Sequence, residues 1–95
     1  ALRLKPDFEA AHNNLGVALK NQGDLAGAAH QFSEAIRVNP NYAEAWNNLG
    51  ISLKEQGRLK EAKDSFRRAL HISPNYAAAR RNLEEAERAQ APKAN

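Results

Sequence analysis

Asparagine is the residue whose type and spacing point most directly to a chemical task in this sequence. Asn14, Asn48 and Asn82 are spaced 34 residues apart, and each precedes a leucine. A carboxamide carries two N–H donors and an oxygen acceptor. It can therefore hydrogen-bond the backbone of an extended peptide whatever side chains that peptide has. The same groups could instead bond neighbouring helices and only hold a stack together, so the sequence leaves both roles open.

Patterns typical of catalysis or metal binding are not found in the sequence. The histidines His12, His30 and His71 are not paired with each other or with a carboxylate at the spacing of metal ligands. No serine lies in a nucleophile elbow, and the five glycines are single residues that form no phosphate-binding loop. Cysteine is absent, which excludes disulfides and thiolate metal sites. We therefore predict no enzymatic activity, no cofactor and no metal.

The composition limits the classes of partner. The chain has 95 residues, which is room for one small domain, and a net charge of +3 from interspersed acidic and basic residues. This charge is too small to indicate a nucleic-acid partner. No apolar run approaches the roughly 20 residues that cross a bilayer, so we expect no membrane partner. No compartment can be assigned from these residues.

A repeat of 34 residues organises the chain. Pro6, Pro40 and Pro74 have this spacing, as do Leu15, Leu49 and Leu83. We expect two repeat units, 7–40 and 41–74, followed by a C-terminal capping helix within 75–91 and a frayed tail at 92–95. Residues 1–6 resemble the ends of the two units, so we expect them to be the last turn of a preceding helix in a longer protein.

Each unit has the pattern of two helices. Apolar residues follow helical spacing from Phe8 to Leu19. Gly23 and Gly57 supply the left-handed residue that ends a first helix, and Asp24 is placed to cap a second one. Asn41 with Glu44 has the form of a capping box. We expect five helices and no strand, with the phenylalanines of the second helices filling the space between helix pairs.

The second unit resembles the tetratricopeptide repeat (TPR). It reads Trp46-x-x-Leu49-Gly50-x-x-Leu53, then Ala62-x-x-x-Phe66, then Pro74. The first unit matches at most of these positions but has His12 in the place of Trp46. We expect Trp46 to be buried. The resemblance implies an all-α, right-handed solenoid of antiparallel helix pairs in which glycine and alanine let paired helices approach closely.

The resemblance also implies a function. Domains of this family are non-catalytic scaffolds, and the first helices of their repeats line a concave groove that binds a peptide or partner protein. We expect Asn13 and Asn47 in particular to face solvent and be free to bind. The predicted groove residues are Asn13, Asn14, Val17, Lys20, Asn21, Glu44, Asn47, Asn48, Ile51, Lys54, Glu55, Arg81, Asn82 and Glu85.

Narrower resemblances give further alternatives. The asparagine column resembles the repeat region of O-linked N-acetylglucosamine transferases and of many bacterial repeat proteins. The chain could therefore be the substrate-recruiting arm of a larger enzyme such as a glycosyltransferase. In family members that hold the C-terminal carboxylate of chaperones, Lys, Asn, Lys and Arg would stand at Asn13, Val17, Ala78 and Asn82, so most of that clamp is missing. The remaining alternative is a structural solenoid that self-associates through its uncapped N-terminal end.

Overall fold

The computed structural model describes residues 8–90, with side chains to residue 89, and contains five helices and no strand in that range. The helices are α1 (Phe8–Asn21), α2 (Leu25–Val38), α3 (Ala43–Glu55), α4 (Leu59–Ile72) and α5 (Ala77–Gln90). The expected features of residues 1–7 and 91–95 lie outside the described part of the chain.

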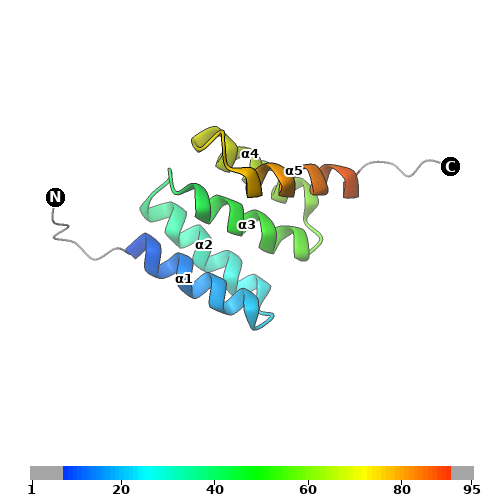
Figure 1. Ribbon diagram of the computed structural model, residues 1–95. Coiled ribbons are helices and arrows are strands. Elements are labelled where there is room, and N and C mark those ends of the chain that lie inside the picture. Colours follow the sequence, from blue (N-terminus) through cyan, green and yellow to red (C-terminus); the bar gives the residue numbers. More distant parts are fainter. Residues whose placement is uncertain (1–7, 91–95) are drawn as a thin grey trace.

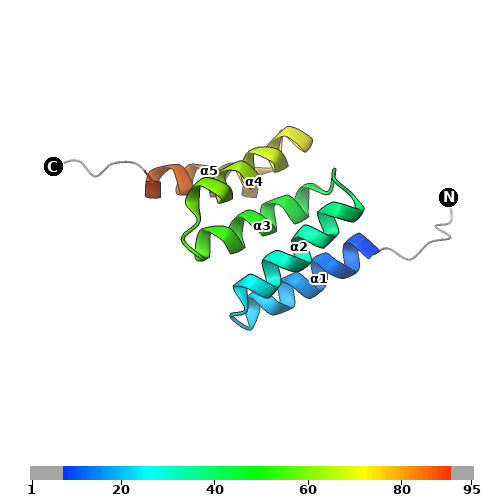
Figure 2. The same cartoon turned by 180° about the vertical axis from the view of Figure 1, so that it is seen from behind.

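The helices pack in sequence order. α1 pairs with α2, and α3 pairs with α4, while α2 packs on α3 and α4 on α5. α1 also contacts α3, and α3 contacts α5, so these three first helices lie side by side (Figure 1). The view from behind shows α2 and α4 on the other side of the molecule (Figure 2). The all-α repeat architecture predicted from the sequence is confirmed.

Glycine determines where the first helix of each pair ends. Gly23 and Gly57 have φ values of 89° and 84°, a left-handed conformation that favours glycine over every residue with a side chain. After the first of these turns, Asp24 Oδ1 accepts a hydrogen bond from the backbone N–H of Gly27 at 2.9 Å. This is the predicted N-cap of α2. At the equivalent position Arg58 provides no side-chain cap for α4.

A second pair of glycines brings the helices of each unit together. A Cβ atom on Gly16 would lie 2.5 Å from Cε1 of Phe32, and one on Gly50 would lie 2.5 Å from Cε1 of Phe66. Both rings are fully buried. Each phenylalanine therefore lies against the glycine of its own helix pair. Phe66 also belongs to a buried cluster with Ala86 of α5, so it fills space between its pair and the next helix, as predicted.

The turn between the units differs from its prediction. α3 begins at Ala43 with Tyr42 as N-cap, and no side chain bonds the first turn. The capping box of Asn41 and Glu44 is therefore absent. The physical reason is a local turn in which the backbone N–H of Asn41 donates to Oδ1 of Asn39 at 3.2 Å. That bond holds Asn41 in the turn, and the helix starts later.

In α3 and α5, equivalent side chains hydrogen-bond the turn that precedes the helix. Trp46 Nε1 donates to the carbonyl oxygen of Pro40 at 2.9 Å, and Arg80 Nη2, 34 residues later, donates to that of Pro74 at 2.9 Å. Trp46 is only half-buried, contrary to expectation. The exposed guanidinium of Arg68 lies over its ring, 5.5 Å from the centroid. At the third equivalent position, His12 Nδ1 lies 2.8 Å from Oε1 of Gln31.

Candidate functional site

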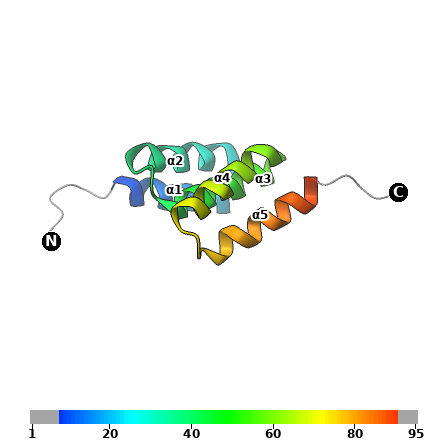
Figure 3. The ribbon, with the colours of Figure 1, turned by 90° about the horizontal axis from the view of Figure 1, so that it is seen from above.

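The candidate site is the surface formed by α1, α3 and α5, which we call the A-helix face. Figure 3 shows α5 on the opposite side of the molecule from α2. The residues described enclose no pocket, so any ligand of this face would lie on an open surface. They also contain no group of three or more His, Asp or Glu side chains able to hold a metal ion. Within the described part of the chain, no helix is long and apolar enough to cross a bilayer.

Asn13 and Asn47 are buried on this face. Their side chains are 1% and 4% exposed, so the expectation that they face solvent is wrong. Asn13 Nδ2 donates to Oε2 of Glu44 at 3.1 Å, and its Oδ1 accepts from Nδ2 of Asn48 at 3.0 Å. Both partners are on α3. The carboxamide of Asn13 is covered because α3 packs beside α1 and bonds it at both ends.

The same arrangement recurs one repeat later. Asn82 Nδ2 on α5 donates to Oδ1 of Asn47 on α3 at 3.0 Å. The two bonds, Asn48 to Asn13 and Asn82 to Asn47, each join residues 35 apart, and we call them the asparagine ladder. Asn48 and Asn82 are half-buried, whereas Asn14 on α1 is exposed. The column of Asn14, Asn48 and Asn82 therefore supports the stack through its second and third members.

Tyr76 joins the ladder from the turn before α5. It is half-buried, and its pKa is raised, chiefly by burial and then by the negative charge of Glu44. A side-chain hydrogen bond with Asn47 acts in the opposite direction and lowers that pKa. The link between Tyr76 and Asn47 was not predicted, because the 34-residue spacing of Tyr42 and Tyr76 shows that they are equivalent but not what a hydroxyl reaches.

An ion pair connects α3 to α5 further along the face. Lys54 Nζ lies 3.0 Å from Oε1 of Glu85, and both side chains are partly exposed. This hydrogen bond, with the charge of Lys54, lowers the pKa of Glu85. Such a pair contributes little to stability at a solvated surface. Its main effect is to fix the positions of two charges on the A-helix face.

The remaining predicted groove residues differ in exposure. Val17, Lys20 and Ile51 are half-buried, whereas Asn21, Glu44, Glu55 and Arg81 are exposed. Arg81 is equivalent in the repeat to Asn13 and Asn47, but it forms no hydrogen bond or ion pair with any residue in the described range. The structure thus brings Asn13, Asn47, Asn48, Asn82, Glu44, Lys54 and Glu85 into contacts across the first helices.

Comparison with known proteins identifies the family. A family model described as tetratricopeptide repeat matches residues 13–77. The first TPR of Spaghetti (RPAP3) bound to the HSP90 peptide SRMEEVD superposes with a TM-score of 0.87 at 25% identity, covering 93% of this chain and 70% of that one. The Sgt2 TPR domain from Aspergillus fumigatus gives a TM-score of 0.83 at 25% identity, covering 95% of this chain and 66% of that one.

Curated protein sequences gave no match. The family assignment therefore rests on the matched model, on the fold shared with these two structures, and on the repeated contacts between Gly16 and Phe32 and between Gly50 and Phe66. Together they confirm the resemblance seen in the sequence. The chain belongs to the tetratricopeptide-repeat family.

Proposed function

We propose that this chain is a non-catalytic interaction module that binds an extended segment of a partner protein on the A-helix face. The observation that carries the proposal is the orientation of Asn48 and Asn82. Each uses one Nδ2 donor for the ladder, and no hydrogen bond from a described residue occupies its Oδ1. One acceptor and one donor per residue are therefore available for a peptide backbone.

The spacing of these groups suits an extended chain. Packed helices lie about 8–10 Å apart, and an extended peptide advances about 3.3 Å per residue. An asparagine on α3 and one on α5 would therefore bond the backbone about every third residue. The solved structure of the Spaghetti domain with an HSP90 peptide supports this proposal, because that relative of similar fold holds a peptide. The chaperone-type carboxylate clamp is not proposed, because Val17, Ala78 and Asn82 replace its charged and amide residues.

The test selects peptides that bind the chain and then maps where they bind. Random heptapeptides displayed on phage are selected against the immobilised chain, and the selected peptides are titrated into the labelled protein by NMR. We expect the largest shifts at the side-chain amides of Asn48 and Asn82. Asn82→Ala should weaken binding, while Glu84→Ala, an exposed change on the same helix, should not. Shifts confined to the outer surfaces of α2 and α4, or no selected peptide, would refute the proposal.

A second candidate function, self-association, is favoured by the outer face of α1. Leu15 is 48% exposed and Phe8 54% exposed. Ala11 and Ala18 on the same face are exposed, whereas their equivalents Ala45 and Ser52 are fully buried against α2. Sedimentation over a range of concentrations tests this candidate. Leu15→Lys should keep the protein monomeric if the face associates, and a wild-type chain that stays monomeric at high concentration excludes it.

A further inference from the structure

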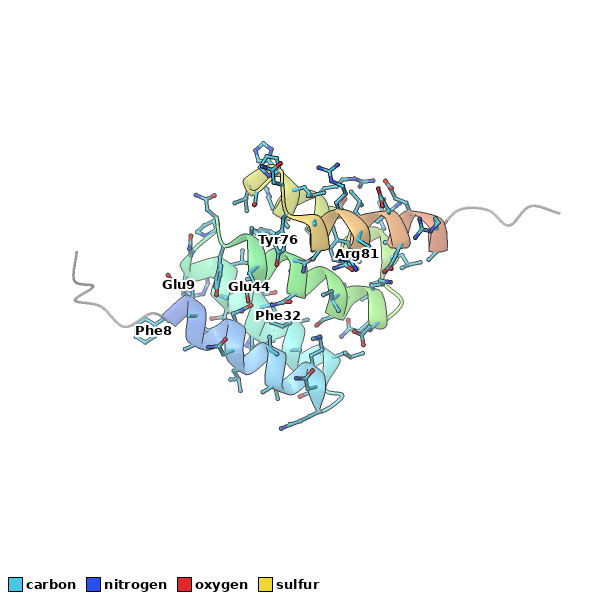
Figure 4. All side chains as sticks on the ribbon, in the orientation of Figure 1. Phe8, Glu9, Phe32, Glu44, Tyr76 and Arg81 are labelled. Carbon is cyan, nitrogen blue, oxygen red and sulfur yellow. The ribbon has the colours of Figure 1, made fainter. Side chains whose placement is uncertain are left out.

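Besides the Lys54–Glu85 ion pair, the A-helix face carries charges of opposite sign on adjacent first helices at Glu44 on α3 and Arg81 on α5. Figure 4 shows both, with Tyr76 lying between them. Both residues are exposed. The inference drawn from them rests on the function proposed above and specifies the partner further.

Glu44 is held in position by buried groups. Its Oε2 accepts from Asn13, which is itself fixed by Asn48, while no hydrogen bond from a described residue occupies Oε1. The carboxylate is thus oriented by a hydrogen bond from a buried carboxamide and still reaches solvent. Its negative charge contributes to the raised pKa of the Tyr76 phenol. Glu44 is therefore a pre-positioned negative charge at the edge of the asparagine ladder.

Arg81 differs from most other arginines of the described chain. It has no hydrogen bond, ion pair or ring contact with a described residue, although its charge helps to lower the pKa of Glu85 one turn later. Its position in the repeat is that of the buried ladder residues Asn13 and Asn47. Because no further helix covers it among the described residues, its guanidinium faces solvent beside the last step of the ladder. The arginines with such contacts are Arg37, Arg58, Arg67, Arg68 and Arg80.

The two charges define a register for a bound peptide. The residue of α5 that is equivalent to Glu44 is Ala78, 34 positions later. Arg81 lies three residues beyond Ala78, which is a rise of about 4.5 Å along the helix. Combined with a distance of about 8–10 Å between packed helices, this separates the two residues by about 10 Å. That distance corresponds to about three residues of extended chain.

We infer that the partner is an extended peptide with a basic side chain opposite Glu44 and an acidic side chain opposite Arg81, about three residues apart and in a fixed order. Charge complementarity selects the pair, because reversing the order would place like charges together on both helices. The asparagine ladder bonds the peptide backbone between them. A guanidinium also suits a carboxylate by its paired donors.

The experiment repeats the peptide selection on two double variants. Glu44→Lys with Arg81→Glu reverses both charges without changing the net charge. The matched control, Lys60→Glu with Glu84→Lys, reverses one exposed charge on α4 and one on α5. Glu84 is equivalent to Gly50, where an added Cβ would point at Phe66 rather than along the asparagine ladder. The wild type and the control should enrich one order of basic and acidic residues, and the charge-reversed chain should enrich the other order.

Individual affinities give the size of the effect. For a selected peptide, we expect exchange of its basic and acidic residues to weaken binding about fivefold, and less at high salt. Glu44→Gln and Arg81→Gln, which keep the fold without the charge, should each remove about half of this preference. Far-UV circular dichroism checks that every variant remains folded.

The outcomes separate the two proposals. Selected peptides could shift the NMR signals of Asn48 and Asn82 but show no preferred charge order, or show the same order for the charge-reversed chain. In that case the proposed charge register is refuted, while the proposed peptide-binding function stands. If no peptide binds the A-helix face, both are refuted.

Discussion

Asn48 on α3 donates from Nδ2 to Oδ1 of Asn13 on α1 at 3.0 Å, and the accepting carboxamide is almost fully buried. This bond joins the first helices of the two units directly. The surface proposed to bind a partner and the contact between repeats are therefore built from the same residues.

Removing the buried carboxamide should cost stability. Asn13→Ala leaves the N–H of Asn48 and the carboxylate of Glu44 without their partner, and we expect a loss of about 1–3 kcal/mol in the free energy of unfolding. Asn14→Ala, an exposed neighbour, should change it by no more than about 0.5 kcal/mol. Urea denaturation measures both variants, and equal effects would contradict a structural role for Asn13.

The contact between Gly50 and Phe66 predicts the effect of adding one methyl group. Alanine is the better helix former by about 0.5–1 kcal/mol, but its Cβ would lie 2.5 Å from the buried ring. Overpacking costs about 1–3 kcal/mol, so we expect Gly50→Ala to lower the free energy of unfolding. In a Phe66→Leu background the same change should cost less, and a double-mutant cycle by denaturation gives this coupling. Simple additivity would contradict the close contact.

Replacing Ser52 should stabilise the protein rather than destabilise it. Its Oγ is buried without a hydrogen-bond partner in the described structure, and the equivalent residues Ala18 and Ala86 are alanines. Ser52→Ala should raise the free energy of unfolding by about 1 kcal/mol or more. Ser33→Ala, an exposed change within α2, gains only the helix propensity of about 0.5 kcal/mol. A stabilisation no larger than that of Ser33→Ala, measured by thermal denaturation, would indicate that the hydroxyl has a partner.

The pKa of Tyr76 should respond to Glu44. Because the carboxylate disfavours the phenolate, Glu44→Gln should lower this pKa, while burial keeps it above the ordinary value of about 10. Absorbance titration at high pH in a Tyr42→Phe background isolates Tyr76. A pKa raised by folding stabilises the protein fully below the unfolded value, and this contribution is lost as pH rises through the folded pKa. An unchanged titration in Glu44→Gln would contradict the proximity.

The repeat and the helix ends could be predicted because they depend on local chemistry. A left-handed turn needs a glycine such as Gly23, and Asp24 caps the helix three residues from its bonding partner. Asn13 could not be placed in the same way. Helical periodicity assigns it to a face, but whether the next first helix covers that face depends on packing between residues 31 and 35 positions apart.

The start of α3 shows a second limit of prediction from sequence. Asn41 and Glu44 have the residue types of a capping box, yet Oδ1 of Asn39, and not the carboxylate of Glu44, accepts the hydrogen bond from the backbone N–H of Asn41. Two short polar side chains beside the same turn offer alternative local bonds. Residue types alone do not decide between them.

The asparagine ladder also gives the array a direction. On each step the residue nearer the C-terminal end of the chain supplies the N–H, and the residue nearer the N-terminal end supplies the oxygen. Two units can thus be joined head to tail with every step satisfied, whereas two N-terminal ends would oppose donor to donor and two C-terminal ends would oppose oxygen to oxygen. Concatenated copies of 41–74 should consequently extend in one orientation only, which makes this motif a useful connector for building longer arrays.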